Sequence, residues 1–248
     1  MEGVIRNVRT YGHFCLVARA LERVGDRWSL LVIRDLLTGA KRFTDLMDRL
    51  GGITPKTLSQ RLRELEEDGI VLADREPGRR EVWYRLTPAG ADLEPVVEAL
   101  NRWGLRRSWR WPQPGEPVHA EHLLRTAVQA IDDATDDHRP ARWHFRLDGH
   151  DYLVHSDGDR WRVSAEAPST PAEVTVTGTA AALVALIFNQ SDRDLAIAGD
   201  AEAIRRLERL LATLATVVPP AQPRPTEQAT ANPGGPPQEP RPSAAPAG

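Results

Sequence analysis

The chain has 248 residues, 41% of them hydrophobic, a formal net charge of −3 and one cysteine. This length suits one or two domains with ordinary hydrophobic cores. The single cysteine, Cys15, excludes a disulfide framework within the chain and a cysteine-rich zinc site. No apolar run reaches the roughly 18–20 residues of a membrane span, and residues 1–6 lack the pattern of a signal peptide. The sequence therefore predicts a cytoplasmic protein with no membrane partner.

Charge is unevenly distributed along the chain. Residues 1–111 hold 20 Lys and Arg against 16 Asp and Glu, whereas residues 112–248 hold 12 against 19. A basic front part and an acidic back part fit a domain that binds a polyanion, joined to a domain of another kind.

Three amphipathic helices are predicted before residue 51. Apolar side chains recur at helical spacing in residues 14–24, 26–39 and 43–50. In the first of these, Phe14, Val17, Leu21 and Val24 share one stripe. Gly25 ends the first helix, and Gly39 follows the second.

A fourth helix is predicted to begin at Pro55, where Thr54 is well placed to cap it. Its apolar side chains fall at i, i+4 and i+7, which leaves one narrow face to bury. The outward face carries side chains that donate to phosphates and base edges, namely Lys56, Thr57, Ser59, Gln60 and Arg63. This polarity predicts a DNA-recognition helix, and an ordinary capped surface helix is the alternative.

A hairpin is predicted next, with strands at residues 70–75 and 81–86. The turn between them carries Arg79 and Arg80, which either contact DNA phosphates or stay solvated. Helices followed by a hairpin with a basic tip describe a winged helix-turn-helix.

A further helix is predicted from Thr87-Pro88 to about Trp103, with a kink at Pro95. One side of it is so apolar that it needs a cover. A second copy of the chain is the simplest candidate.

Five runs follow one another along residues 10–105, at residues 20–28, 39–46, 52–58, 62–71 and 84–90. This ordered series closely resembles the HxlR family of bacterial winged-helix transcription regulators, which are related to the MarR family. The resemblance implies a homodimer that binds a near-palindromic double-stranded DNA operator. It also implies that the first and last helices of the domain form the dimer contact. The residues then expected on DNA are Thr54, Lys56, Thr57, Ser59, Gln60 and Arg63 on the helix, with Arg79 and Arg80 on the wing.

Cys15 falls where many members of the HxlR family carry a cysteine. In some of them this thiol senses oxidants or electrophiles, so the resemblance implies a redox sensor at Cys15. The proline that often follows this cysteine is Leu16 here. A cysteine that only packs as a small apolar residue is the alternative.

A linker rich in Arg, Trp and Pro is predicted at residues 106–117, and a second domain at residues 118–217. Apolar spacing and Asp-Gly turns there favour both helices and strands. The expected elements are helices at 120–134, 180–188 and 204–214, and strands at 143–147, 152–155, 161–165 and 173–177.

The run at residues 172–183, followed by residues 195–201, resembles the sterol carrier protein type-2 fold. In that fold a strand-helix unit and a Gly-Asp turn line an apolar tunnel. The resemblance implies an apolar small-molecule effector beside Leu183, Leu186, Ile187 and Phe188, and plain core packing is the alternative. It also leaves a second function open: an enzyme or lipid carrier acting through this domain, with the winged helix as a protein-interaction module.

Residues 219–248 hold 10 of the chain's 20 prolines and little that forms a core, so a disordered tail is predicted at 218–248. His119 and His122 have no partner at diagnostic spacing, so no metal site is predicted. No nucleotide-binding loop or nucleophile elbow is present, and no catalytic residue or cofactor is predicted.

The sequence as a whole predicts an α+β protein. Its expected parts are a winged helix-turn-helix domain at residues 1–105, a linker at 106–117, a sterol-carrier-like domain at 118–217 and a Pro-rich tail at 218–248.

Overall fold

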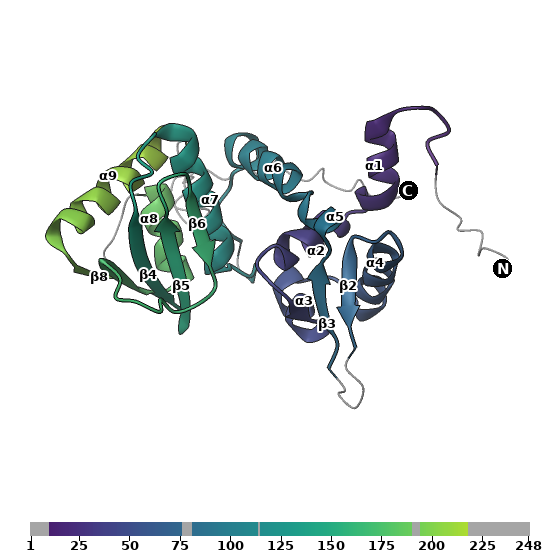
Figure 1. Cartoon of the computed structure of the whole chain (residues 1–248), viewed down its shortest axis with the longest axis horizontal. Helices are drawn as coiled ribbons and strands as arrows, with labels where there is room; N and C mark the ends of the chain where they lie inside the picture. Colours follow the sequence, from purple (N-terminus) through teal and green to yellow (C-terminus); the bar gives the residue numbers. More distant parts are fainter. Residues whose placement is uncertain (1–9, 76–80, 114, 190–193, 218–248) are drawn as a thin grey trace, which may run out of the picture.

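The computed structural model describes residues 10–75, 81–113, 115–189 and 194–217. Helices and strands are mixed, and two hydrophobic cores lie along the long axis of the molecule, each with a sheet of its own (Figure 1). The predicted tail at 218–248 lies outside the described residues. Within the described part, no helix is long and apolar enough to cross a membrane.

The N-terminal core is a winged helix-turn-helix. Its helices are α1 (Leu16–Val24), α2 (Ser29–Leu36), α3 (Phe43–Leu50) and α4 (Pro55–Glu67). Its antiparallel sheet has the order β1-β3-β2, from β1 (Lys41–Arg42), β2 (Val71–Asp74) and β3 (Trp83–Leu86). The predicted α3 is confirmed to the residue. The two-residue β1 was missed, because a strand that short carries no period-2 pattern.

The first helix begins later than predicted, and most of its predicted apolar stripe is not covered by the rest of the chain. Residue Phe14 precedes α1 and is 88% exposed, and Val17 and Leu21 also face solvent. Of the predicted stripe, only Val24 is buried. Amphipathic spacing shows that a helix has an apolar side, but it does not show whether this chain covers that side.

The single kinked helix predicted from Thr87 was wrong. The structure has two helices, α5 (Pro88–Ala91) and α6 (Glu94–Arg107), with a break at Asp92 and Leu93. Pro95 lies in the first turn of α6, where its missing N–H leaves no helical hydrogen bond unmade. The proline therefore starts a helix rather than bending one.

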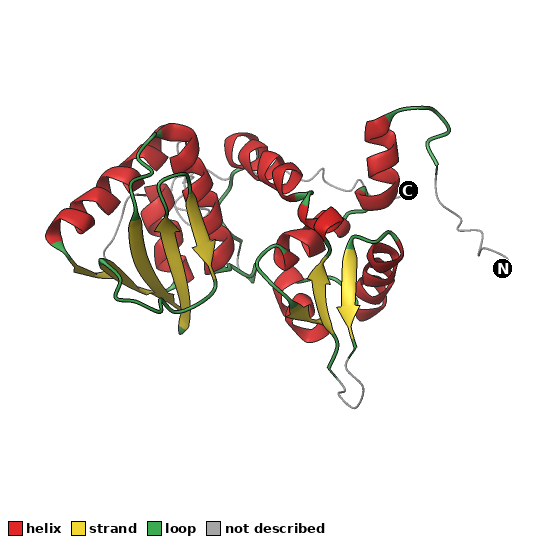
Figure 2. Ribbon diagram, viewed as in Figure 1, coloured by secondary structure: helices red, strands yellow, loops and turns green. Residues whose placement is uncertain are grey.

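The C-terminal core is a five-stranded sheet with three helices on one face (Figure 2). The strands β4 (Ala141–Leu147), β5 (His150–Ser156), β6 (Trp161–Ser164), β7 (Val174–Gly178) and β8 (Ala196–Gly199) are ordered β6-β5-β4-β7-β8. Only the β4–β7 pair is parallel. The helices are α7 (Ala120–Ala134), α8 (Ala180–Asn189) and α9 (Ala201–Val217).

Alternation along β4 explains which face is covered. Trp143, Phe145 and Leu147 are buried at period two, and they pack with buried side chains of all three helices. Residues 196–199, for which no strand was predicted, pair with β7 as an edge strand. A side chain on Gly199 would place its Cβ only 2.2 Å from the carbonyl oxygen of Glu173, and the next residue, Asp200, caps α9. This Gly-Asp pair therefore has a packing role and a capping role.

Helix α7 connects the two parts of the molecule. Leu124, Val128 and Ile131 bury its apolar face in the C-terminal core. Its polar face lies against α6 and against the ends of α2 and α3. The side chain of Trp109 in the preceding segment stacks on Phe188, with ring centroids 3.5 Å apart.

Candidate nucleic-acid interface

Helix α4 is fixed in the molecule by its cap and by its apolar face. The Thr54 hydroxyl accepts a hydrogen bond from the backbone N–H of Thr57 at 3.2 Å, which satisfies one of the free donors of the first turn. Leu58, Leu62 and Leu65 are almost completely buried in the N-terminal core. The buried face determines which side chains point outward.

The outward face of α4 carries the side chains expected to contact DNA. Lys56, Ser59, Gln60 and Arg63 are exposed, and Thr57 is half-buried with its hydroxyl 2.8 Å from that of Thr54. Gln60 donates to Glu64 at 2.6 Å, and Arg63 donates to Gln60 at 3.3 Å. Exposed contacts of this kind contribute little stability, so both side chains are free to change partners.

The two ends of α4 differ electrostatically. Lys56 lies in the first turn, beside the positive end of the helix dipole, where a cation is unfavourable unless an anion is bound there. At the other end, Arg75 binds Glu66 through two hydrogen bonds of 2.6 and 2.8 Å, which lower the pKa of Glu66. Arg61 pairs with Glu64 at 2.5 Å. Glu64 and Glu66, near the C-terminal end, are thus paired with arginines, whereas Lys56 at the N-terminal end is exposed.

The wing is described up to its tip. Strands β2 and β3 pair antiparallel, but Arg79 and Arg80 lie outside the described residues, so their role stays a prediction. Arg42 at the base of the wing already forms two ion pairs, with Asp45 at 3.0 Å and with Glu81 at 3.2 Å.

Cys15 lies at the N-cap position of α1 and is half-buried. Its carbonyl oxygen accepts the backbone N–H of Arg19 at 3.0 Å. No contact of the thiol distinguishes a redox sensor from a packing residue, and the sensor stays a prediction.

The side chains expected beside an apolar effector occupy the C-terminal core. Leu183 and Ile187 are buried there, Leu186 is partly buried against it, and Phe188 stacks on Trp109. These positions are those of packing residues. An apolar ligand beside them stays a prediction.

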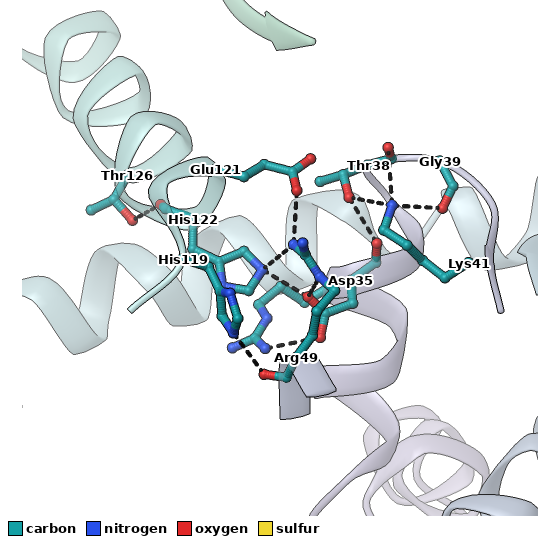
Figure 3. A network of polar contacts seen from close by, with 10 residues as sticks. Asp35, Thr38, Gly39, Lys41, Arg49, His119, Glu121, His122 and Thr126 are labelled. Carbon is teal, nitrogen blue, oxygen red and sulfur yellow. Dashed lines mark hydrogen bonds and ion pairs between the residues drawn. The ribbon is translucent and has the colours of Figure 1, made fainter. Parts of the chain in front are cut away.

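A buried polar network joins the helix-turn-helix to α7, and it was not predicted from the sequence (Figure 3). Asp35 on α2 is 0% exposed and accepts from Arg49 of α3 at 3.0 Å and from Arg34 at 3.0 Å. His122 Nε2 lies 2.8 Å from the same carboxylate, so this nitrogen carries a proton. Arg49 also donates to Glu121 at 2.7 Å. Because Asp35 and His122 are 87 residues apart in the chain, no local spacing marks the pair.

The network has a defined charge state. Burial opposes ionisation of Asp35, but the hydrogen bond from His122 and the nearby charges of Arg34, His122 and Arg49 outweigh it and hold the pKa of Asp35 well below its usual range. Burial lowers the pKa of His122, and the charges of Arg34 and Arg49 add to this, against the effect of Asp35. The carboxylate is therefore charged and the imidazole neutral near pH 7.

Histidines 119 and 122 were interpreted as polar residues at a helix entrance, and this is where they lie. Their rings are 5.4 Å apart at the start of α7, and His119 Nε2 lies 3.0 Å from the carbonyl oxygen of Arg49. Among the described residues, no cluster of His, Cys, Asp and Glu has the arrangement of a metal site.

Comparison with known proteins places the N-terminal part of the chain in a family. Residues 23–110 match the family model described as HxlR-like helix-turn-helix. An HTH-type transcriptional regulator of Synechocystis sp. is 38% identical over 94 residues, which are 38% of this chain and 70% of that protein. One of Mycobacterium bovis is 44% identical over 110 residues, which are 43% of this chain and 66% of that protein.

The chain was also compared with solved structures. A MarR-family transcriptional regulator of Enterococcus faecalis is 37% identical, with 36% of this chain and 82% of that chain covered and a TM-score of 0.34. The family match ends at residue 110, so the C-terminal sheet lies outside it, and its likeness to a sterol carrier is not shown. The chain belongs to the HxlR-like helix-turn-helix family of transcriptional regulators.

Proposed function

We propose that this protein binds a near-palindromic operator as a homodimer and places the N-terminal half of α4 in the major groove. The observation that carries this proposal is the outward face of α4, which is capped, exposed and basic at its first turn. Its family consists of transcriptional regulators, which supports DNA as the partner.

Each exposed side chain suits a particular contact. The ammonium group of Lys56, in the first turn, suits a phosphate. Gln60 and Arg63 lie along the helix on the same side, where an amide suits adenine and a guanidinium suits guanine. Arg79 and Arg80 on the wing would add phosphate contacts that hold α4 in register.

The exposed apolar surface suits a second copy of the chain. On α6, Trp103 is 61% exposed, and Val96 and Leu100 are also largely exposed. Near α1, Phe14 and Val17 are uncovered as well. An exposed set of large apolar side chains marks an interaction surface. A twofold axis beside α1 and α6 would present two copies of α4 to successive major grooves, as operator symmetry requires.

The test is selection of a duplex from random DNA, followed by affinity measurements at several salt concentrations. Replacing Lys56 by Ala should weaken binding to all sequences and reduce the salt slope by about one unit. The matched control is Arg209→Ala, which removes an exposed cation from α9, on the C-terminal side of the molecule. No selected sequence, or equal loss in both variants, would contradict the proposal.

A second measurement tests the dimer. Trp103→Glu should convert a dimer to a monomer in sedimentation and abolish binding to the full operator at concentrations that saturate the wild type. A monomeric wild-type protein that binds its operator at full affinity would remove the dimer from the proposal.

A further inference from the structure

A cavity of about 320 Å³ lies between α6 and α7 and is bounded by α2 and β6. Its size is at the lower end of the range for small-molecule sites. One wall comes from the part of the chain that matches the HxlR family and the other from the C-terminal region. Any molecule bound there would touch both parts of the protein.

The lining combines an apolar body with a few fixed polar groups, as ligand sites do. Leu37, Val97, Val128, Trp161 and Val163 supply the apolar part. Asn101 of α6 donates to Gln129 of α7 at 2.8 Å, so an amide pair crosses the cavity wall.

The acidic groups of the lining have nearby basic or donor groups. Glu94 pairs with Arg125 at 2.7 Å, and Asp133 pairs with Arg102 at 2.6 Å. Asp132 accepts the backbone N–H of Trp161 at 3.1 Å. Glu98 is close enough to Arg102 to help raise its pKa, after the larger effect of the Asp133 hydrogen bond.

Two arginines of the lining could bind a further anion. The Nε atom of Arg34 is buried and has no acceptor among the described residues. Arg160 also lines the cavity and is exposed; it forms no ion pair within 4.0 Å in the described part of the chain, although its charge opposes the rise that burial causes in the pKa of Asp132. A buried donor without an acceptor is uncommon in native proteins. The Arg34 side chain would have to turn toward the cavity for a bound molecule to accept from this atom. An anion with a planar oxygen pair suits a guanidinium best.

The cavity also reaches the buried network. Arg34 and His122 both line the cavity and both contact Asp35, which in turn accepts from Arg49 on α3. Helix α3 is directly followed by the turn into α4. A ligand that draws Arg34 toward the cavity would therefore take a cation away from Asp35, whose contact with His122 holds the helix-turn-helix against α7.

We propose that this cavity binds a small organic carboxylate with an apolar body, and that its occupancy changes operator affinity through Arg34 and Asp35. The second half rests on the proposed DNA-binding function, and the first half does not. Binding is therefore measured on the full chain without DNA before any operator is used.

The probes are benzoate, phenylacetate, 3-phenylpropionate and octanoate, each compared by calorimetry with its neutral amide and its matched amine. We expect saturable binding of at least one carboxylate, at least tenfold tighter than its amide. Arg34→Lys keeps the charge beside Asp35 but removes the Nε–H, and should weaken that carboxylate about tenfold. Arg160→Gln lies outside the core and should weaken it about two- to fivefold, whereas Arg209→Gln on α9 should not change it.

Three results would overturn the site: no saturable carboxylate, a carboxylate no tighter than its amide or amine, or unchanged affinity in both Arg34→Lys and Arg160→Gln. If a carboxylate binds, operator affinity is then measured with and without it. A change of about fivefold or more that is lost in Arg34→Lys supports the coupling. Operator binding that is unaffected by a saturating carboxylate overturns it. A protein that binds a carboxylate but no DNA would contradict the proposed function and leave the site standing.

Discussion

The outward face of α4 and the buried contact of α2 and α3 with α7 both consist of polar and charged side chains, but they use them in opposite ways. On α4, Gln60 and Arg63 are exposed and interact with neighbours in the same helix. At the contact, Asp35 and Glu121 are buried and bind groups 14 to 87 residues away. Exposed polar pairs are worth little and exchange readily, whereas a buried charge depends on every partner it has. Burial therefore separates the charges available for DNA from the charges that hold the molecule together.

The largest expected effect comes from removing Arg49. Replacing it by Met leaves Asp35 and Glu121 buried without the cation between them, which typically costs about 3–5 kcal/mol of unfolding free energy. Urea unfolding followed by tryptophan fluorescence measures this loss. The matched control is Arg63→Met on α4, which removes an exposed arginine from a helix and should change stability by at most about 0.5 kcal/mol. Equal losses of unfolding free energy in the two variants would show that burial does not determine how much an arginine contributes to stability.

A smaller effect is expected on the outward face of α4, in base specificity rather than in stability. Gln60→Ala should relax base preference at one operator position by about 1–3 kcal/mol. Its unfolding free energy should stay within about 0.5 kcal/mol of the wild type, because the Gln60 side chain is exposed. Affinity measured on all four bases at each operator position checks this. A uniform loss on every sequence would assign Gln60 to the phosphate backbone instead.

The helix cap tests how firmly α4 is presented. Thr54→Ala removes the acceptor for the Thr57 N–H and should cost about 1 kcal/mol of stability. Thr54→Ser keeps the hydroxyl, and its stability should be close to that of the wild type. If both variants lose operator affinity with no loss of stability, the Thr54 methyl group contacts DNA and the cap is a minor term.

How much of this was predictable from sequence differs between the two regions. Helix α4 was predicted correctly because its signals are local: Thr54 and Pro55 start it, and Leu58, Leu62 and Leu65 share one face. The buried contact was missed because it joins residues that are distant in the chain. Asp35 sits among apolar residues in an ordinary amphipathic helix, and nothing near it indicates a partner on α7.

The apolar faces of α1 and α6 were recognised from the sequence. Both helices were expected to form a dimer contact, and the structure leaves Phe14, Val17 and Trp103 uncovered within the chain. The apolar helix α8 is buried instead, with Leu183 and Ile187 in the core. Hydrophobicity predicts that a face will be covered by something, and only the fold shows whether the cover belongs to the same chain.

The smallest expected effect is a pH dependence of stability that belongs to the buried contact alone. Groups on three elements surround His122: Asp35 and Arg34 from α2, Arg49 from α3, and Glu121 beside it on α7. The pKa of His122 is lowered in the folded protein, so below its usual value of 6.5 the unfolded chain binds a proton that the folded chain resists. Stability should therefore fall as the pH drops below 6.5, and fall again below 3.8 as Asp35, whose pKa is lowered, becomes protonated first in the unfolded chain.

His122→Gln keeps a donor for Asp35 without titrating. The difference in unfolding free energy between pH 7.5 and pH 5, measured by urea unfolding, should therefore be smaller in this variant than in the wild type. The control is His13→Gln, which removes an exposed histidine and should leave the wild-type difference in place. If the two variants have the same pH dependence, the buried contact does not titrate as its geometry requires, and its stability comes from Arg49 and the carboxylates alone.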